Sequence, residues 1–330
     1  MAFSAPVVHS SHFPLEQCAG GPHNAEVNSQ QPAVNEHVAS RDYKYYIFDW
    51  DDNILHMPTR IHLEKRLPDG SWVPQAVSTS VFSVIRGDPA NYRPPAGDWE
   101  RAFAEFQDTP DPRGSRFLAD TEQAIRRVLD GAEPPGPSFT TFRRTLTEGR
   151  LFAIVTARGH ASETLRRGVQ CFIDLVLSPQ ERTAMMANLR GYRAVFDQAT
   201  RFGSDAEELE RYLSLNRYHA VTSPDFHSRL LAGAPGPVTP ETRKQVAIRD
   251  FIEHIVRVMQ RTPAGARWAP VSVGFSDDDP ANVEAVGNYL RDELARRFPG
   301  IKFVLYDTSD PALEKGRKIT VAGQLDLGLV

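Results

Sequence analysis

The chain has 330 residues, a net charge of −4 and a sequence pI near 6.2, and 41% of its residues are hydrophobic. This balance offers no basic footprint for a nucleic-acid backbone, so we expect no nucleic-acid partner. No window reaches the roughly 20 apolar residues of a membrane-spanning helix, and the first residues lack a secretory signal. We therefore expect a cytoplasmic protein without a membrane partner, and the two cysteines, Cys18 and Cys171, are too few for a disulfide framework.

Residues 1–41 are rich in Ser, Asn, Gln, Pro, Gly and His and show no helical or strand period. This composition predicts a disordered tail. The spacing of its histidines is irregular, which favours solvated side chains over a metal site.

Four short apolar runs follow, at 45–48, 151–155, 271–275 and 302–306, with a weaker one at 218–222. Continuous apolar runs of this length are typical of strands buried on both faces, and a helical pattern follows each of the four stronger runs. The alternation predicts an α/β fold with a doubly wound, Rossmann-like parallel sheet. Ligands of such folds bind at the carboxyl ends of the strands.

Two segments depart from the alternation. We interpret residues 57–135 as a cap inserted after the first strand, with a hairpin at Pro68-Asp69-Gly70 and helical patterns at 99–106 and 117–129. We interpret residues 173–216 as a helical extension of the core. The core itself is then formed by residues 42–56 and 136–330.

The first strand ends in Asp49-Trp50-Asp51-Asp52. Residues two apart on a strand share a face, so Asp49 and Asp51 project together, whereas Trp50 and Asp52 point elsewhere. Two adjacent carboxylates repel unless a cation lies between them or one holds a proton, and Mg²⁺ suits such a site. A plain acidic turn is the alternative. A calcium-binding loop does not fit, because its sixth and twelfth positions hold Ile54 and Arg60 instead of Gly and Glu.

A second acidic cluster follows the run at 271–275. Asp279 precedes Pro280 and is explained as the N-cap of a helix. Capping does not explain Asp277 and Asp278, which we expect to be a second pair of metal ligands at the same edge of the sheet.

Thr156 ends another apolar run shortly before a helical pattern, so its hydroxyl and the free amides of that helix would lie where an anion binds. Arg158 is a candidate for contacting a phosphate, although a surface arginine fits the sequence equally well.

Lys244 is the only lysine between Lys65 and Lys302. It lies four residues before Ile248 on the apolar stripe of a helix that opens at Thr239-Pro240, so it faces the core. A lysine that only extends its ammonium to solvent is the alternative.

In this order the four clusters resemble the motifs of the haloacid dehalogenase-like (HAD) hydrolase superfamily, over roughly residues 43–306. The resemblance implies an aspartyl-phosphate mechanism with Mg²⁺ as cofactor. Its implied roles are Asp49 as nucleophile, Asp51 as general acid and base, Thr156 and Lys244 as phosphate ligands, and Asp49, the carbonyl of Asp51, and Asp277 as metal ligands supported by Asp278.

The retained Asp51 implies phosphoryl transfer instead of dehalogenation, and the cap implies a small phosphorylated metabolite as substrate. Asn53 and Asn282 depart from the family pattern. We therefore expect a Mg²⁺-dependent phosphatase. The alternatives are a phosphomutase or another phosphoryl transferase of the same superfamily, and a non-catalytic HAD-like binding or regulatory protein.

Overall fold

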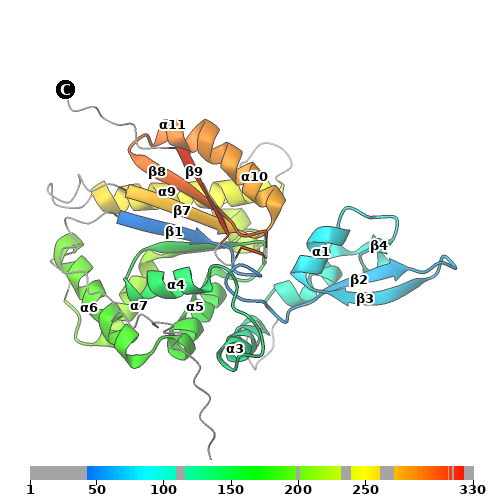
Figure 1. Cartoon of the computed structure of the whole chain (residues 1–330), viewed down its shortest axis with the longest axis horizontal. Helices are drawn as coiled ribbons and strands as arrows, with labels where there is room; N and C mark the ends of the chain where they lie inside the picture. Colours follow the sequence, from blue (N-terminus) through cyan, green and yellow to red (C-terminus); the bar gives the residue numbers. More distant parts are fainter. Residues whose placement is uncertain are drawn as a thin grey trace, which may run out of the picture. The chain divides into compact units, whose positions relative to one another are not determined.

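The computed structural model describes residues 43–108, 116–197, 201–231, 239–260, 271–310, 312–313 and 316–322. A six-stranded sheet has the order β6-β5-β1-β7-β8-β9 (Figure 1). Its strands are β1 (Tyr43–Phe48), β5 (Phe152–Thr156), β6 (Arg217–Ala220), β7 (Val271–Asp277), β8 (Ile301–Asp307) and β9 (Arg317–Ala322). All pairs are parallel except β8 with β9. The five predicted strands are confirmed, and the predicted tail, residues 1–41, lies outside the described residues.

Helices pack on both faces of this sheet, which makes the fold Rossmann-like. One apolar cluster combines Phe48 of β1 with the helices that follow β1 and β5. Those helices are α3 (Arg116–Leu129), α4 (Phe139–Thr147), α5 (Ser162–Val176), α6 (Pro179–Phe196) and α7 (Asp205–Leu215). The other cluster combines Ile47 with α9 (Pro240–Gln260) and α10 (Pro280–Tyr289). Neighbouring residues of β1 thus anchor opposite layers, as expected for a strand buried on both faces.

Shorter elements complete the core. They are α8 (Pro224–Phe226) with the π turn η4 (His227–Leu231), and the π turn η6 (Leu290–Leu294) with α11 (Ala295–Arg297), which extend α10. The described residues of the stretch 173–216 are mostly helical as predicted, since they comprise the end of α5 followed by α6 and α7. None of the helices in the described parts of the chain is long and apolar enough to cross a membrane.

The segment between β1 and α3 forms a second, antiparallel sheet of order β3-β2-β4. Its elements are β2 (Ile61–Arg66), β3 (Trp72–Val77), α1 (Thr79–Ile85), β4 (Tyr92–Arg93), η2 (Pro95–Gly97), α2 (Trp99–Ala102) and η3 (Ala104–Phe106). The predicted hairpin is present, and its turn needs a glycine because Gly70 has a φ of +85°. Whether this inserted segment acts as a cap stays a prediction.

Helix α3, although it falls within the predicted insertion 57–135, packs on the core helix α5. Phe117 of α3 is fully buried in the core cluster. It lies so close to Gly168 of α5 that a Cβ at that glycine would come within 2.6 Å of the ring. The small sheet has a separate cluster of its own, which includes Ile61, Leu63 and Val77.

Candidate active site

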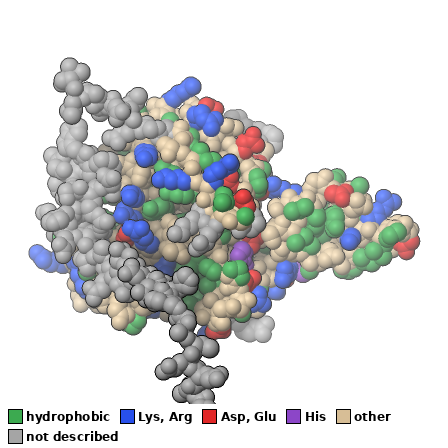
Figure 2. Space-filling view, in the orientation of Figure 1, with side chains coloured by type: hydrophobic (Ala, Val, Ile, Leu, Met, Phe, Trp, Pro, Cys, Tyr) green, Lys and Arg blue, Asp and Glu red, His purple; other side chains and the backbone are tan. Residues whose placement is uncertain are grey.

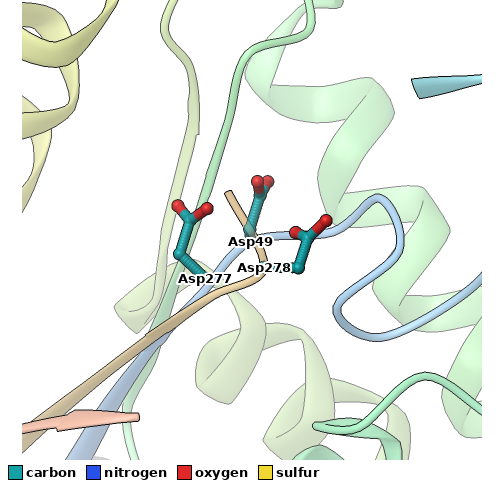
Figure 3. Close-up of side chains that lie close together, drawn as sticks. All are labelled: Asp49, Asp277 and Asp278. Atoms are coloured by element: carbon teal, nitrogen blue, oxygen red, sulfur yellow. The ribbon is translucent and has the colours of Figure 1, made fainter. Parts of the chain in front are cut away.

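Three carboxylates meet at the carboxyl edge of the sheet. Asp49 directly follows β1, while Asp277 ends the adjacent strand β7 and Asp278 follows it. The two strands run in parallel with Phe48 beside Ser276, so their ends lie together. One carboxylate oxygen from each of the three residues lies within 4.8 Å of the others. Figure 3 shows the three side chains projecting toward the same space. The sequence prediction that these aspartates would meet at one edge agrees with this geometry.

Lys244 joins two of these carboxylates. Its ammonium donates to Asp49 Oδ2 at 3.1 Å and to Asp277 Oδ2 at 2.6 Å. The side chain is only 2% exposed, because α9 turns it inward on the same face as Ile248 and Phe251. The ammonium is therefore an internal counter-charge, and the alternative of a lysine that reaches for solvent is excluded.

The cluster holds three carboxyl groups and one ammonium, so it carries more negative than positive charge when all three carboxyl groups are ionised. Burial, together with Asp277 and Asp51, raises the pKa of Asp49 to about 7 even though Lys244 lowers it. Burial and then the charges of Asp277 and Asp49 raise the pKa of Asp278 well above its ordinary value. Burial lowers the pKa of Lys244, but Asp277 and Asp49 more than reverse this effect. The raised pKa values of Asp49 and Asp278 thus reflect burial and then repulsion between carboxylates, both of which another cation would offset, whereas the raised pKa of Lys244 reflects attraction to the carboxylates.

The charge balance of the cluster suits a divalent metal ion. Three carboxylates facing one ammonium leave an excess of two negative charges, which a divalent cation would neutralise. Carboxylate oxygens are the ligands that Mg²⁺ prefers in proteins. Asp49, Asp277 and Asp278 therefore fit Mg²⁺, and they would hold it together.

Backbone and amide donors fix the orientation of these carboxylates. Asp49 Oδ1 accepts a hydrogen bond from Trp50 N at 2.8 Å. Asp277 Oδ1 accepts from Asp279 N at 3.0 Å and from Asn282 Nδ2 at 3.2 Å. Asn282, one of the two departures from the family pattern, thus holds the Asp277 carboxylate in place.

Asn53, the other departure, belongs to a buried hydrogen-bond network behind the site. Its amide donates to Thr308 Oγ1 at 2.9 Å and accepts from Ser276 Oγ at 3.0 Å, and Ser138 donates to Ser276 at 3.0 Å. The network ties the loop after β1 to β7 and to the loop after β8. A threonine or valine at position 53 would not supply both the donor and the acceptor.

Asp51 lies apart from the three-carboxylate cluster. Both of its carboxylate oxygens accept from Arg158, whose Nε and Nη2 lie at 2.8 Å and 2.6 Å. Thr156 Oγ1 lies 3.4 Å from Asp51 Oδ2. The carbonyl of Asp51, a predicted metal ligand, accepts from Asn53 N at 2.6 Å. Asp51 must share or leave the pair with Arg158 before it can donate a proton to a substrate.

Arg158 is fully buried, so the surface-arginine alternative is wrong. Its guanidinium also donates to Thr59 at 2.9 Å and lies over the rings of Phe106 and Phe117 at 4.7 Å and 5.0 Å. Its Nη1 has no hydrogen-bond partner among the described residues. The role of Arg158 and Thr156 in binding phosphate stays a prediction, since most donors of Arg158 are already engaged with Asp51 and Thr59.

The N-terminus of α5, predicted as an anion site, holds an anion from the chain itself. Asp108 accepts from Ala161 N at 2.6 Å and from the hydroxyl of Thr164 at 3.0 Å. Gly159 N also donates to Phe106 O at 2.9 Å. The amides of this helix terminus thus anchor the inserted segment instead of remaining free for a substrate.

The inserted segment also contacts the rim of the carboxylate cluster. Thr79 of α1 donates to Asp52 Oδ2 at 2.5 Å, and Arg86 forms an ion pair with Asp279 at 2.9 Å. Asp52 Oδ1 also forms a hydrogen bond with His56 Nδ1 at 2.9 Å. Asp52 lies outside the group formed by Asp49, Asp277 and Asp278, and it links the loop after β1 to the inserted segment.

No family model, curated protein or solved structure matches the chain. The residues of the site and their geometry are therefore what indicates a function.

Sequence reasoning missed the partners of Asp51 and of helix α5. Arg158 is a sequence candidate because it lies two residues after Thr156, but its partner Asp51 is 107 positions away. Asp108 lies in a polar stretch without any period, and no local pattern marks it. Only the folded insertion brings Asp108 and Thr59 to the loop after β5.

Proposed function

We propose that this protein is a Mg²⁺-dependent phosphatase of the HAD-like type, which hydrolyses the phosphate monoester of a small metabolite. The proposal is carried by one observation: Lys244 bridges Asp49 and Asp277 inside a buried cluster that also holds Asp278. A cluster that served only the fold would not need three carboxylates around one ammonium. The excess negative charge is suited to hold a metal ion, and the metal ion together with Lys244 would attract a phosphoryl group.

In the proposed reaction, a carboxylate oxygen of Asp49 attacks phosphorus, and the ester P–O bond breaks. Asp51 gives a proton to the leaving oxygen. Water then attacks the aspartyl-phosphate and gives its proton to Asp51, which releases inorganic phosphate and restores both carboxyl groups. Lys244 neutralises charge beside Asp49 throughout. Bound Mg²⁺ would supply further neutralisation of the transferring group.

The ion pair with Arg158 restricts when Asp51 can donate a proton. While both oxygens of Asp51 accept from Arg158, Asp51 is held as a base, which suits the step in which water is activated. Donation to the leaving oxygen requires Asp51 to gain a proton and one oxygen to leave the guanidinium. Arg158 is thus proposed to position Asp51.

A small substrate is supported by the contacts of the inserted segment. Thr79 and Arg86 of this segment contact Asp52 and Asp279, which lie next to the proposed metal ligands in the sequence. A large macromolecular substrate would have to displace these contacts to reach Asp49.

The test is Mg²⁺-dependent phosphate release from an aryl phosphate and from a panel of sugar and other metabolite phosphates. Asp49→Asn should lower the rate by about 10³-fold or more, because no nucleophile is left. Asp69→Asn, in the exposed turn of the β2–β3 hairpin, is the matched control and should keep full activity. The proposal is wrong if Asp49→Asn keeps its activity, or if the wild type works equally well in EDTA.

A further inference from the structure

Three of the six lysines of the chain lie on one face of the six-stranded sheet. Lys44 of β1 and Lys302 of β8 are in one row of the sheet, with Ser272 between them. Lys318 of β9 pairs with Tyr306 of β8, which is four residues beyond Lys302 on the same strand. Residues in register on neighbouring strands point to the same side, so the three side chains share a face with Tyr306.

This part of the face has no apolar helical layer over it among the described residues. On the opposite face, β7 and β8 bury Val273 and Phe303 against α9 and α10. The cluster on the lysine side contains no residue of β7 or β8. A hollow of about 320 Å³ lies there instead. Its lining consists of Lys44, Tyr45, Tyr46, Val271, Ser272, Gly274, Lys302, Val304, Tyr306 and Lys318.

The lysines of this hollow carry uncompensated charge. Lys44, Lys302 and Lys318 are exposed, and none is in an ion pair within the described part of the chain. The neighbouring Arg317, by contrast, pairs with Asp307 at 2.9 Å. No acidic residue is among the described lining residues. Figure 2 shows Lys and Arg side chains over the region of β1, β7 and β8. The hollow is therefore an attractive place for an anion.

Two half-buried tyrosine rings lie beside the charges. Tyr46 and Tyr306 lie on either side of Gly274, where a Cβ would come within 3.2 Å and 3.1 Å of the rings. A second hollow of about 170 Å³ is lined by the same two tyrosines and Gly274. Burial raises the pKa of both tyrosines, so their hydroxyls are neutral at physiological pH. Glycine at position 274 keeps the space around the rings free.

We propose that this hollow, which we call the lysine face, binds a nucleoside di- or triphosphate. The three ammonium groups match the three or four negative charges of such a polyphosphate. A base is a flat π system that stacks on tyrosine rings, an interaction worth roughly 1–3 kcal/mol in single-stranded nucleic-acid complexes. The volume is at the lower end of the usual range for small-ligand sites, roughly 300–1,000 Å³. The lysine face lies along the strands, away from the cluster at their carboxyl ends, and goes beyond the proposed phosphatase activity.

Isothermal titration of the full chain with ATP and, separately, with inorganic tripolyphosphate in Mg²⁺ buffer tests the proposal. We expect ATP to bind more tightly than tripolyphosphate, because only ATP has a base. Lys302→Gln should weaken ATP binding about tenfold, the effect of one lost charge-assisted contact. Lys65→Gln is the matched control, since Lys65 is also an exposed lysine without an ion pair among the described residues, but on the inserted sheet. Tyr306→Leu should remove the advantage of ATP over tripolyphosphate.

Three results would overturn the proposal. The first is the absence of ATP binding at millimolar concentration. The second is an equal effect of Lys302→Gln and Lys65→Gln on ATP affinity. The third is ATP binding that survives Lys302→Gln but is lost in Asp278→Asn, which would place the nucleotide at the carboxylate cluster. Phosphatase activity of Lys302→Gln, measured on an aryl phosphate, should equal that of the wild type. Failure of the phosphatase assay alone leaves the binding result intact.

Discussion

Asp49 and Asp51 are two residues apart in the sequence, yet their surroundings have opposite charge balance. Asp49 belongs to a cluster in which three carboxylates face the single ammonium of Lys244. Asp51 has its own guanidinium, and Arg158 meets both of its oxygens. One region therefore needs a further cation, whereas the other is already neutral. Removing a positive charge from each region should produce effects that differ in their response to metal.

The largest effect on stability is expected for Arg158→Leu. The substitution leaves Asp51 buried without a counter-charge, and breaking a buried ion pair costs about 3–5 kcal/mol. We expect the free energy of unfolding in urea to fall by this amount in EDTA and also in Mg²⁺, because the metal site is elsewhere. Arg101→Leu, at an exposed ion pair on α2, is the control and should cost under about 1 kcal/mol. A full rescue of Arg158→Leu by Mg²⁺ would contradict the separation of the two regions.

Lys244→Met should show the opposite dependence on metal. In EDTA the three carboxylates lose their only cation, and we expect a loss of about 3 kcal/mol or more in the free energy of unfolding. Mg²⁺ replaces part of the missing charge, so the loss should shrink as Mg²⁺ is added. Urea unfolding over a Mg²⁺ series measures this, with the exposed Lys65→Met as control. If Mg²⁺ leaves the deficit unchanged, the cluster does not bind the metal.

His160 gives a smaller effect, which depends on pH. It is fully buried beside Arg158, and burial with the charge of Arg158 lowers its pKa to about 3. The unfolded chain, with a histidine pKa of 6.5, takes up the proton first as the pH falls. The neutral side chain of His160 therefore contributes stability to the folded protein above pH 6.5. This contribution is lost between pH 6.5 and 3, about 2 kcal/mol of it by pH 5.

His160→Phe tests this contribution. Unfolding free energies at pH 8 and pH 5 should differ by about 2 kcal/mol less in His160→Phe than in the wild type. The exposed His227 provides the matched substitution, His227→Phe, as a control for replacing a histidine by phenylalanine. An unaltered pH response in His160→Phe would mean that this histidine titrates in the folded protein as it does in the unfolded chain.

The smallest effect is expected for the dependence of Mg²⁺ affinity on pH. Because the pKa of Asp49 is raised to about 7, Mg²⁺ has to displace a proton from it at lower pH. Between pH 8 and pH 6 we expect Mg²⁺ affinity to fall about tenfold, or about 1.4 kcal/mol. Calorimetry in two buffers of different ionisation enthalpy should detect the released proton. A pH-independent affinity without proton release would exclude Asp49 as a ligand.

The sequence predicted the parts of this site that local pattern controls. Apolar runs followed by Asp49, Thr156 and Asp277 identified the strands and the edge at which they end, because a parallel sheet places carboxyl ends together. The helical period turned Lys244 toward the core. These inferences require only the periodicity of strands and helices.

The rest depends on contacts between segments far apart in the chain. Around the pair of Asp51 and Arg158 lie Thr59 and Phe106 of the inserted segment and Phe117 of α3. Asp108 accepts hydrogen bonds at the N-terminus of α5, but no pattern in the surrounding sequence predicts this contact. Helix α3 falls within the predicted insertion 57–135, whereas Phe117 packs it on α5. Tertiary packing decides each of these cases, and spacing along the chain does not encode it.

Gly168 illustrates how far such packing can extend. It admits Phe117, and the same ring lies over the guanidinium that holds Asp51. A substitution there would push α3 away from α5 and remove one wall around Arg158. In a mutational scan for the proposed phosphatase activity, substitutions of Gly168 should therefore lower activity as substitutions of the proposed catalytic residues Asp49 and Asp51 do, although Gly168 would touch neither the metal nor the substrate.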